Sequence, residues 1–141
     1  MPIEVHIDRR ARIVTAIPRG TLTHEEMIKY QKSVWSRPSV RRFDEVVDMS
    51  YVAGLDFESP QQVMSLAELS AGMDDPNIRT RLAIVASDKL HDALARMYRA
   101  YRDQDARSRR HVEIFHSVEE ALKWLRPKQG KPPVARPAKR K

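Results

Sequence analysis

Apolar residues at the start of the chain recur at every second position, the spacing that is typical of a β-strand. Ile3, Val5 and Ile7 follow this spacing, and a second apolar stretch covers 13–17 after the polar turn 8–11. Two short strands joined by a short turn are typical of an antiparallel hairpin. We therefore expect the fold to open with such a hairpin.

The hydrophobic spacing then changes to that of a helix. Thr23 and Glu26 form the sequence signature of a capping box, in which each side chain accepts a hydrogen bond from the other residue's backbone N–H. Tyr30 and Val34 share one helical face, and Pro38 ends the pattern. This segment predicts the first helix.

The rest of the body repeats one unit, a short apolar run followed by a helix-start signal. The runs cover 45–49, 81–86 and 112–115, and the helix starts lie at Ser59, Ser87 and Ser117. Strands that alternate with helices favour right-handed crossovers and a parallel sheet. The sequence therefore predicts a single α/β domain, in which a mostly parallel sheet of about five strands begins with the antiparallel hairpin and about four helices pack on it.

The pattern also makes two local predictions about the helices. Leu90, Leu94 and Tyr98 are expected on the inner stripe of the third helix. Gly72 is expected in the left-handed conformation just past the end of the second helix.

Charge divides the chain into a body and a tail. The 141 residues have a net charge of +7, from 26 Lys and Arg against 19 Asp and Glu. Seven of the bases and none of the acids lie in 126–141, so the remaining 19 bases balance the 19 acids. We interpret 1–125 as a folded, neutral body and 126–141 as a basic, Pro-rich, disordered tail, because the tail has almost no large apolar residue. The tail residues that could contact a polyanion are Lys131, Arg136, Lys139, Arg140 and Lys141.

Nucleic-acid binding stays open as an alternative because of two basic regions. Segment 96–110 interleaves six arginines with Tyr98 and Tyr101, a mixture that can grip phosphate and stack on bases. The simpler interpretation places both tyrosines on the buried stripe and leaves the arginines on a solvated helix face. Seven tail cations on duplex DNA would give a log-log salt slope of about −6 at most, so weak contact with nucleic acid or an acidic surface is the strongest prediction for the tail.

No strong catalytic or metal-binding signature is present in the sequence. The chain has no cysteine, which excludes disulfides, thiolate zinc sites and cysteine nucleophiles. Its five histidines form no His-x-x-x-His pair and are interpreted as surface or cap residues. Asp48, Ser50, Ser87, Asp88 and His116 fall near predicted strand ends, but neither serine lies in a Gly-x-Ser-x-Gly elbow. We therefore predict that the protein is not an enzyme and needs no cofactor or metal. Because no signal peptide or membrane span is evident, we also predict a cytoplasmic location.

The order of elements and several phrases resemble the SpoIIAA-like proteins of the STAS superfamily. The phrases are GTLTHEEM at 20–27, EVVDMS at 45–50, ESPQQ at 58–62, LAIVAS at 82–87 and VEIFHSVEEALKWL at 112–125. In the last phrase, Phe115, Ser117, Glu119, Glu120, Ala121, Leu122, Trp124 and Leu125 match the family's closing pattern. The resemblance covers nearly all of the body and none of the tail. It implies a SpoIIAA-like, STAS-type fold and a regulatory or interaction domain rather than an enzyme.

The resemblance also draws attention to one serine. In anti-sigma-factor antagonists of the superfamily, an Asp-Ser pair at the start of a helix carries the phosphorylated serine. Here Asp56 is followed by Phe57, and the nearest hydroxyl belongs to Ser59, which is already predicted to be a helix N-cap. Ser59 is therefore a candidate phosphorylation site, with the capping role favoured.

We predict a non-catalytic protein-interaction module that contacts a protein partner, or a second copy of itself, through the loop 50–59. The apolar residues expected to be exposed there are Tyr51, Val52, Leu55 and Phe57. The candidate interaction residues are Ser50, Tyr51, Leu55, Asp56, Phe57 and Ser59. The alternative is a domain that binds a small apolar, lipid-like ligand, as related folds of the CRAL-TRIO group do, although a body of this size leaves little room for such a cavity.

Overall fold

The computed structural model describes residues 3–56 and 59–126. In chain order its elements are β1 (Glu4–Asp8), β2 (Ile13–Ile17), β3 (Gly20–Thr23), α1 (His24–Val34), β4 (Asp44–Asp48), the 3-10 turn η1 (Met49–Tyr51), β5 (Val52–Asp56), α2 (Pro60–Met73), β6 (Thr80–Val85), α3 (Lys89–Gln104), β7 (Arg110–Phe115) and α4 (Val118–Leu125). The tail from 127 onward, with its five candidate polyanion-contact residues, lies outside the described residues.

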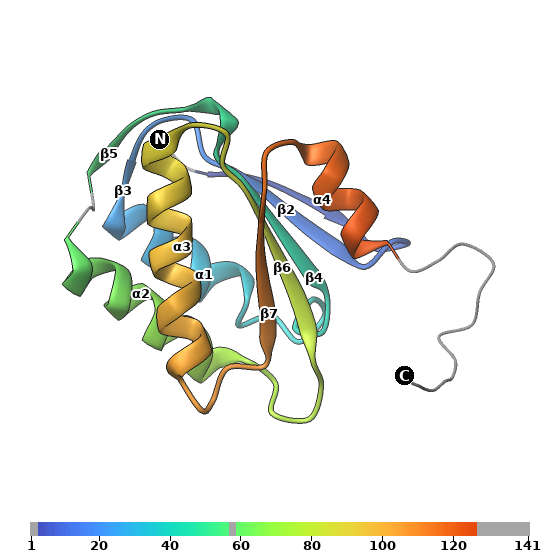
Figure 1. The fold of residues 1–141 in the computed structure, drawn as a ribbon. Helices are drawn as coiled ribbons and strands as arrows, with labels where there is room; N and C mark the ends of the chain where they lie inside the picture. The colour runs from blue at the N-terminus through green and yellow to red at the C-terminus, as the bar shows by residue number, and fades with distance from the viewer. Residues whose placement is uncertain (1–2, 57–58, 127–141) are drawn as a thin grey trace.

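Within the described residues, five strands form the main sheet in the order β1-β2-β4-β6-β7. β1 pairs antiparallel with β2, whereas β2, β4, β6 and β7 run parallel to one another. The opening hairpin, the parallel sheet and the four helices packed on it are confirmed (Figure 1). Because the four parallel strands share one direction, the loops that enter them lie at one end of the sheet and the loops that leave them at the other.

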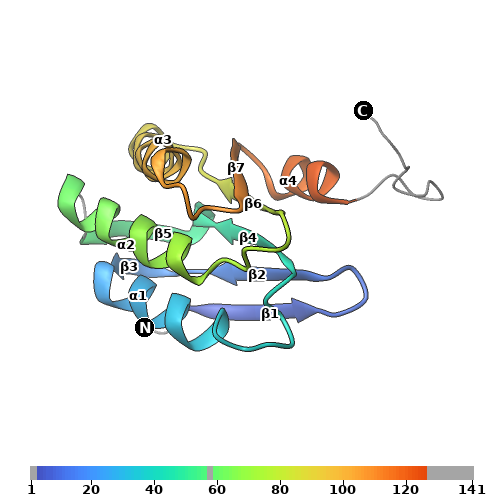
Figure 2. The ribbon, with the colours of Figure 1, turned by 90° about the horizontal axis from the view of Figure 1, so that it is seen from below.

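The sheet carries helices on both faces. α1, α2 and α3 lie along one face and α4 covers part of the other, as the view from below shows (Figure 2). The larger core lies under the three helices and includes Val14, Val47 and Leu82, while Val46 and Ala83 belong to the smaller core under α4. Neighbouring residues of β4 thus serve opposite cores, as alternating strand geometry requires.

The helix starts follow the predicted capping chemistry. The Oγ1 of Thr23 accepts a hydrogen bond from the N–H of Glu26, and a carboxylate oxygen of Glu26 accepts one from the N–H of Thr23, both at 3.1 Å. Ser59 and Ser117 cap α2 and α4. The third prediction is wrong by one position, since Asp88 and not Ser87 caps α3.

A second, two-stranded sheet was not predicted. β3 and β5 pair in parallel, so the predicted loop 50–59 contains a strand. Both strands are short, and each contains one glycine and at least one polar residue, which weakens the strand signal. The prediction that Gly72 follows the end of the second helix is also wrong, because Gly72 lies inside α2. A Cβ at this position would lie 3.0 Å from the Nη1 of Arg107.

The inner stripe of α3 differs from the predicted one. Leu90 is 54% exposed, while His91, Leu94 and Arg102 are buried. The helix is rotated relative to the apolar pattern, with two polar side chains on its inner face: Arg102 pairs with the buried Asp74, and His91 contacts the N-cap residue Asp88. The prediction for Leu90 is therefore wrong, and of the two roles expected for His91, at the surface or in a cap, the buried side chain beside Asp88 fits the cap.

A buried polar cluster lies at the amino ends of the strands. The hydroxyl of Tyr30 donates to a carboxylate oxygen of Glu45 at 2.6 Å, and the indole N–H of Trp35 donates to the same oxygen at 3.2 Å. The guanidinium of Arg110 lies 3.7 Å from Glu45 and 4.1 Å from the centroid of the Trp35 ring. Burial, and then the negative charge of Glu45, raise the pKa of Tyr30 well above its usual value.

The same cluster continues to a second ion pair. Arg102 donates to both carboxylate oxygens of Asp74, at 2.9 and 3.3 Å, and the side chains are 1% and 7% exposed. The backbone N–H of Arg109 also donates to Asp74 at 2.7 Å. Asp74 thereby ties the end of α2 to α3 and to the start of β7.

Candidate interaction surface

The carboxyl end of β4 is shaped by Asp48. This side chain is 5% exposed and accepts a hydrogen bond from the N–H of Ser50 at 3.0 Å, which turns the chain into η1. The carboxylate thus organises the turn that follows β4. Ser50 itself is exposed.

Among the described residues of the predicted interaction loop, Tyr51 is the exposed large apolar side chain, at 54%. The guanidinium of Arg19 lies 4.6 Å from the centroid of its ring, and Arg19 donates in turn to Glu4 at 3.0 Å. Tyr51 is therefore held in an exposed position rather than packed on the sheet. Such a ring offers a large contact area at low entropic cost.

The other predicted contact residues have mixed positions. Leu55 is half-buried and Asp56 is exposed, as an interaction surface requires. Val52 is 7% exposed, so the expectation that it is exposed is wrong, because β5 turns its side chain into the core. Phe57 lies outside the described residues.

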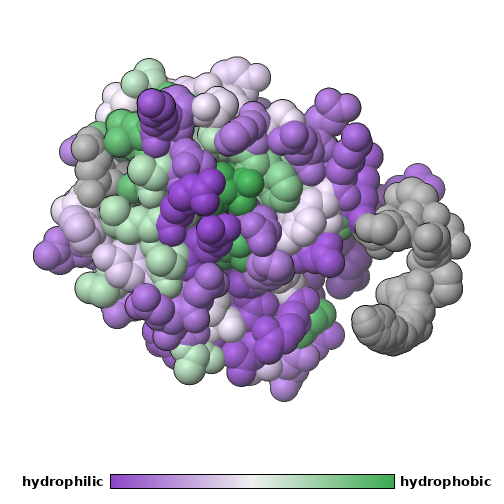
Figure 3. Space-filling model, in the orientation of Figure 1, coloured by the Kyte–Doolittle hydropathy of each residue, from purple (hydrophilic) through white to green (hydrophobic). Residues whose placement is uncertain are grey.

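Two further exposed apolar residues belong to helices that begin at the same end of the sheet. Met64 lies in the first turns of α2 and is 38% exposed, and Leu90 lies at the start of α3 and is 54% exposed. With Tyr51, they are the exposed large apolar side chains found among residues 3–56 and 59–126. We call Tyr51, Leu55, Met64 and Leu90 the carboxyl-end surface. Hydrophobic colour appears near β5 and the start of α3 at the upper left of Figure 3.

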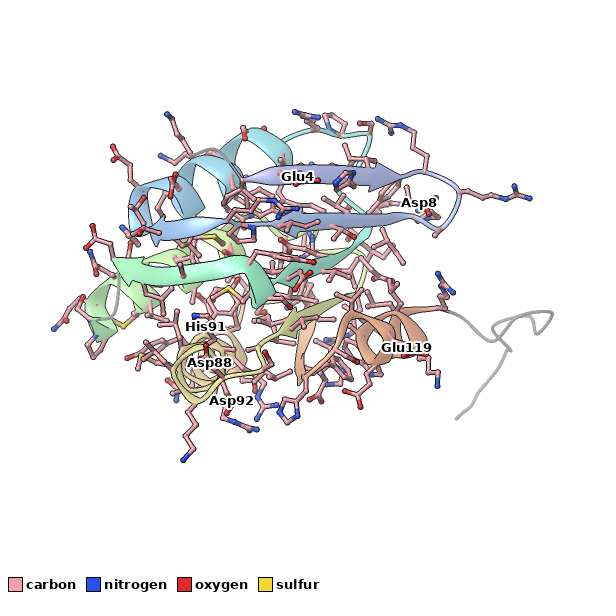
Figure 4. The ribbon with its side chains drawn as sticks, turned by 90° about the horizontal axis from the view of Figure 1, so that it is seen from above. Glu4, Asp8, Asp88, His91, Asp92 and Glu119 are labelled. Atoms are coloured by element: carbon pink, nitrogen blue, oxygen red, sulfur yellow. The ribbon has the colours of Figure 1, made fainter. Side chains whose placement is uncertain are left out.

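Polar side chains at the start of α3 are engaged in fixing that helix. Asp88 accepts a hydrogen bond from the N–H of His91 at 2.8 Å, and its second oxygen lies 3.1 Å from the Nδ1 of His91. Asp92 accepts from Arg96 at 2.8 Å. Seen from above, Asp88, His91 and Asp92 gather at the start of α3 (Figure 4). These contacts make the group a helix cap, and the described residues hold no group of three His, Asp or Glu side chains suited to a metal ion.

Ser59 is exposed, and its hydroxyl accepts a hydrogen bond from the N–H of Gln62 at 3.2 Å. The predicted N-cap role is confirmed. Phosphorylation of Ser59 stays a prediction, and a phosphate at this position would meet the positive end of the α2 dipole.

A small cavity lies between the sheet and the three helices. It measures about 60 Å³ and is lined mostly by apolar residues, with Tyr30, Glu45, Ser70 and Tyr98 as its main polar groups. Burial raises the pKa of Tyr98, as it does for Tyr30. A cavity that holds benzene measures about 150 Å³, so this space is too small for a lipid.

Comparison with known proteins bears on the fold. No family model matches the chain, and no curated protein matches it. A solved structure from Shewanella loihica PV-4 superposes with a TM-score of 0.58 over 88% of this chain and 94% of that chain, at 18% identity. That structure is described as an uncharacterized protein from the DUF3478 family with a SpoIIAA-like fold.

The chain has a SpoIIAA-like fold. At this level of identity the likeness shows the fold alone and assigns no role to any side chain. No helix among the described residues has the length and apolar content needed to cross a bilayer.

Proposed function

We propose that this SpoIIAA-like domain is a non-catalytic interaction module that binds another protein through the carboxyl-end surface. The observation that carries the proposal is the exposure of Tyr51 and Leu90, two large apolar residues that follow the neighbouring strands β4 and β6. Exposed aromatic and aliphatic side chains at one place typically mark a contact site. The nearby carboxylates of Asp48 and Asp88 already bind backbone N–H groups, which favours a structural role for them over a catalytic one.

The charge around this surface suggests the partner's chemistry. Asp56, Asp88 and Asp92 lie in the elements that form the carboxyl end, and Asp56 and Asp88 are exposed. Arg19 beside Tyr51 and Lys89 next to Leu90 in the chain are exposed as well, so a partner with an apolar patch bordered by charges of both signs would complement it. A second copy of the chain is the other candidate, as self-association needs no further protein.

The direct test is affinity purification from the native cell with two baits, the whole chain and its Tyr51→Ser, Leu90→Ser variant. If both residues are hot spots, each truncation costs about 2 kcal/mol or more, which weakens binding of a specific partner by about 30-fold for one residue and by more for the two together. An Arg10→Ser, Arg41→Ser variant, substituted at the opposite end of the sheet, is the matched control and should retain the partner. Equal recovery by all three baits would refute the carboxyl-end surface.

A small apolar ligand is the second candidate function, favoured only by the cavity of about 60 Å³. Native mass spectrometry of protein purified from its own source distinguishes the two candidates. A stoichiometric small molecule would support the ligand-binding function and would require the helices to move apart. A bare mass would support the interaction module.

A further inference from the structure

The neutral charge of the body conceals a strong separation of charge. Segments 8–12, 36–44, 74–81 and 103–110 hold 11 bases and six acids, whereas the remainder of 1–125 holds eight bases and 13 acids. All 11 bases are arginines. These four segments are the turns and loops that enter β2, β4, β6 and β7, so the fold brings them to one end of the sheet.

The loops form a continuous edge along the starts of the strands. The N–H of Asp44 donates to the backbone oxygen of Arg12 at 3.0 Å, and the N–H of Arg81 donates to the carboxylate of Asp44 at 2.9 Å. Thr80 pairs with Arg110 in the next strand. The loops before β6 and β7 lie at the lower edge in Figure 1, and the same margin is mostly hydrophilic in Figure 3.

The excess of positive over negative charge at this edge is larger when only exposed residues are counted. Only two of the six acids are exposed, Asp8 and Asp103. Nine of the arginines are exposed: Arg9, Arg10, Arg12, Arg37, Arg41, Arg42, Arg79, Arg81 and Arg107. We call these nine residues the arginine edge.

Structural roles account for part of the arginine edge. Arg42 is paired with Asp75 at 3.2 Å. Arg107 is paired with Asp105 at 2.8 Å, and its hydrogen bonds lower the pKa of Asp105 to about 2. Helices α1, α2 and α3 also end here, and their dipoles contribute about −1.5 charges together. The segments carry an excess of five positive charges, so these dipoles offset less than a third of it.

We propose that the arginine edge binds the phosphate backbone of duplex nucleic acid, independently of base sequence. Four strand starts at about 4.8 Å spacing span about 14 Å, a length over which a duplex presents about eight phosphate charges. Guanidinium groups bind phosphate with two parallel hydrogen bonds, which suits an edge built of arginine without lysine. Phe43 is the one aromatic residue of the four segments, and it is buried, so stacking on splayed bases is not available.

The sequence that follows Arg126 carries further positive charge. α4 ends at Leu125 beside the start of β6, where Arg81 donates to the backbone oxygen of Trp124 at 2.6 Å. Residues 127–141 contain six more bases and no acid. The contribution of the body must therefore be measured with these six bases neutralised.

The test measures the binding of a labelled DNA duplex of mixed sequence by fluorescence anisotropy at increasing salt. The reference protein is the whole chain with the six bases of 127–141 changed to Gln, which keeps the length. Arg10→Gln, Arg41→Gln and Arg79→Gln are then added to it as one variant. If each of the three contacts one phosphate, the log-log salt slope should become shallower by about 2.7, and the affinity at low salt should fall.

The matched control replaces Lys29, Lys89 and Arg96 by Gln, which changes the net charge equally. These three bases are exposed and lie outside the four segments, so the reference slope should be retained. Equal losses in both variants would show that only net charge matters and would overturn the proposal. Absence of binding by the reference protein at low salt, or tighter binding to polyglutamate than to DNA, would overturn it as well. The unfolding temperature of each variant establishes that it is folded.

Discussion

At the scale of single residues, the fold depends on charges that the core holds in fixed pairs. Glu45 is 5% exposed and receives hydrogen bonds from Tyr30 and Trp35, with Arg110 beside it. A buried carboxylate without such partners would cost several kcal/mol, so each partner is needed to keep it inside. Because each of these hydrogen bonds requires a particular orientation of its donor, the cluster favours a single packing of α1 against the strand starts.

Tyr30→Phe tests this cluster and carries a pH dependence. At neutral pH, loss of a hydrogen bond to a charged group should lower the free energy of unfolding by about 1.5–3 kcal/mol. The folded pKa of Tyr30 is raised, so above pH 10 the unfolded state loses a proton that the folded state retains. Stability should therefore fall as pH rises above 10, by up to about 1.4 kcal/mol per pH unit for one tyrosine.

Urea unfolding at neutral pH and above pH 10 measures both effects. The variant should be less stable at neutral pH and should lose less stability on alkalinisation than the natural chain. Tyr51→Phe, which removes an exposed hydroxyl, is the control. An unchanged alkaline loss in Tyr30→Phe would contradict the buried position of this side chain.

Arg102→Met tests the second buried pair. It leaves Asp74 without its two-hydrogen-bond partner, and removal of one member of a buried pair costs about 3–5 kcal/mol. Arg96→Met is the matched control on the same helix, because its pair with Asp92 is exposed and contributes at most about 1 kcal/mol. Chemical denaturation should show a loss in the free energy of unfolding that is several-fold larger for Arg102→Met than for Arg96→Met. Similar losses would contradict the role of Asp74 in linking α2 to α3.

At the scale of elements, prediction from sequence succeeded where local chemistry decides the structure. The capping box at Thr23 and Glu26 lies within four residues, so it is readable before any tertiary contact is known. The phase of α3 was wrong because two polar residues, His91 and Arg102, are buried on its inner face, and the partner of Arg102, Asp74, is 28 residues away and is supplied only by the fold. β3 and β5 were missed for a related reason, since neither short strand is stable without the other.

Ser59→Ala distinguishes the N-cap role of Ser59 from a role as a phosphorylation switch. Loss of the hydroxyl that accepts from Gln62 should destabilise the protein by about 1 kcal/mol, while leaving any partner recovered through the carboxyl-end surface in place. Ser65→Ala, at an exposed interior position of the same helix, should be neutral or slightly stabilising. Thermal unfolding measures both, and a Ser59→Ala variant of unchanged stability that loses its partner would favour the switch.

At the scale of the whole molecule, the domain has two chemically different ends. The carboxyl-end surface carries exposed apolar residues, and the arginine edge lies at the opposite ends of the same strands. The sequence predicted the loop with Tyr51 but not the exposure of Leu90, which was expected on the inner stripe of α3, and no prediction was made for Met64. It could not predict the arginine edge, because a neutral total says nothing about where the topology places each charge.

If the carboxyl-end surface binds a protein, that contact should be independent of the positive charge at the other end of the sheet. The most direct measurement is affinity capture from the native cell at about 0.15 M and about 1 M salt, where the Debye length falls from about 8 Å to about 3 Å. The baits are the whole chain, the Tyr51→Ser, Leu90→Ser variant and the Arg10→Gln, Arg41→Gln, Arg79→Gln variant. We expect a specific protein that stays bound to the whole chain at high salt, is retained by the arginine variant and is lost by the Tyr51 and Leu90 variant. Recovery of that protein by the Tyr51 and Leu90 variant, or its loss in high salt from the whole chain, would contradict the account.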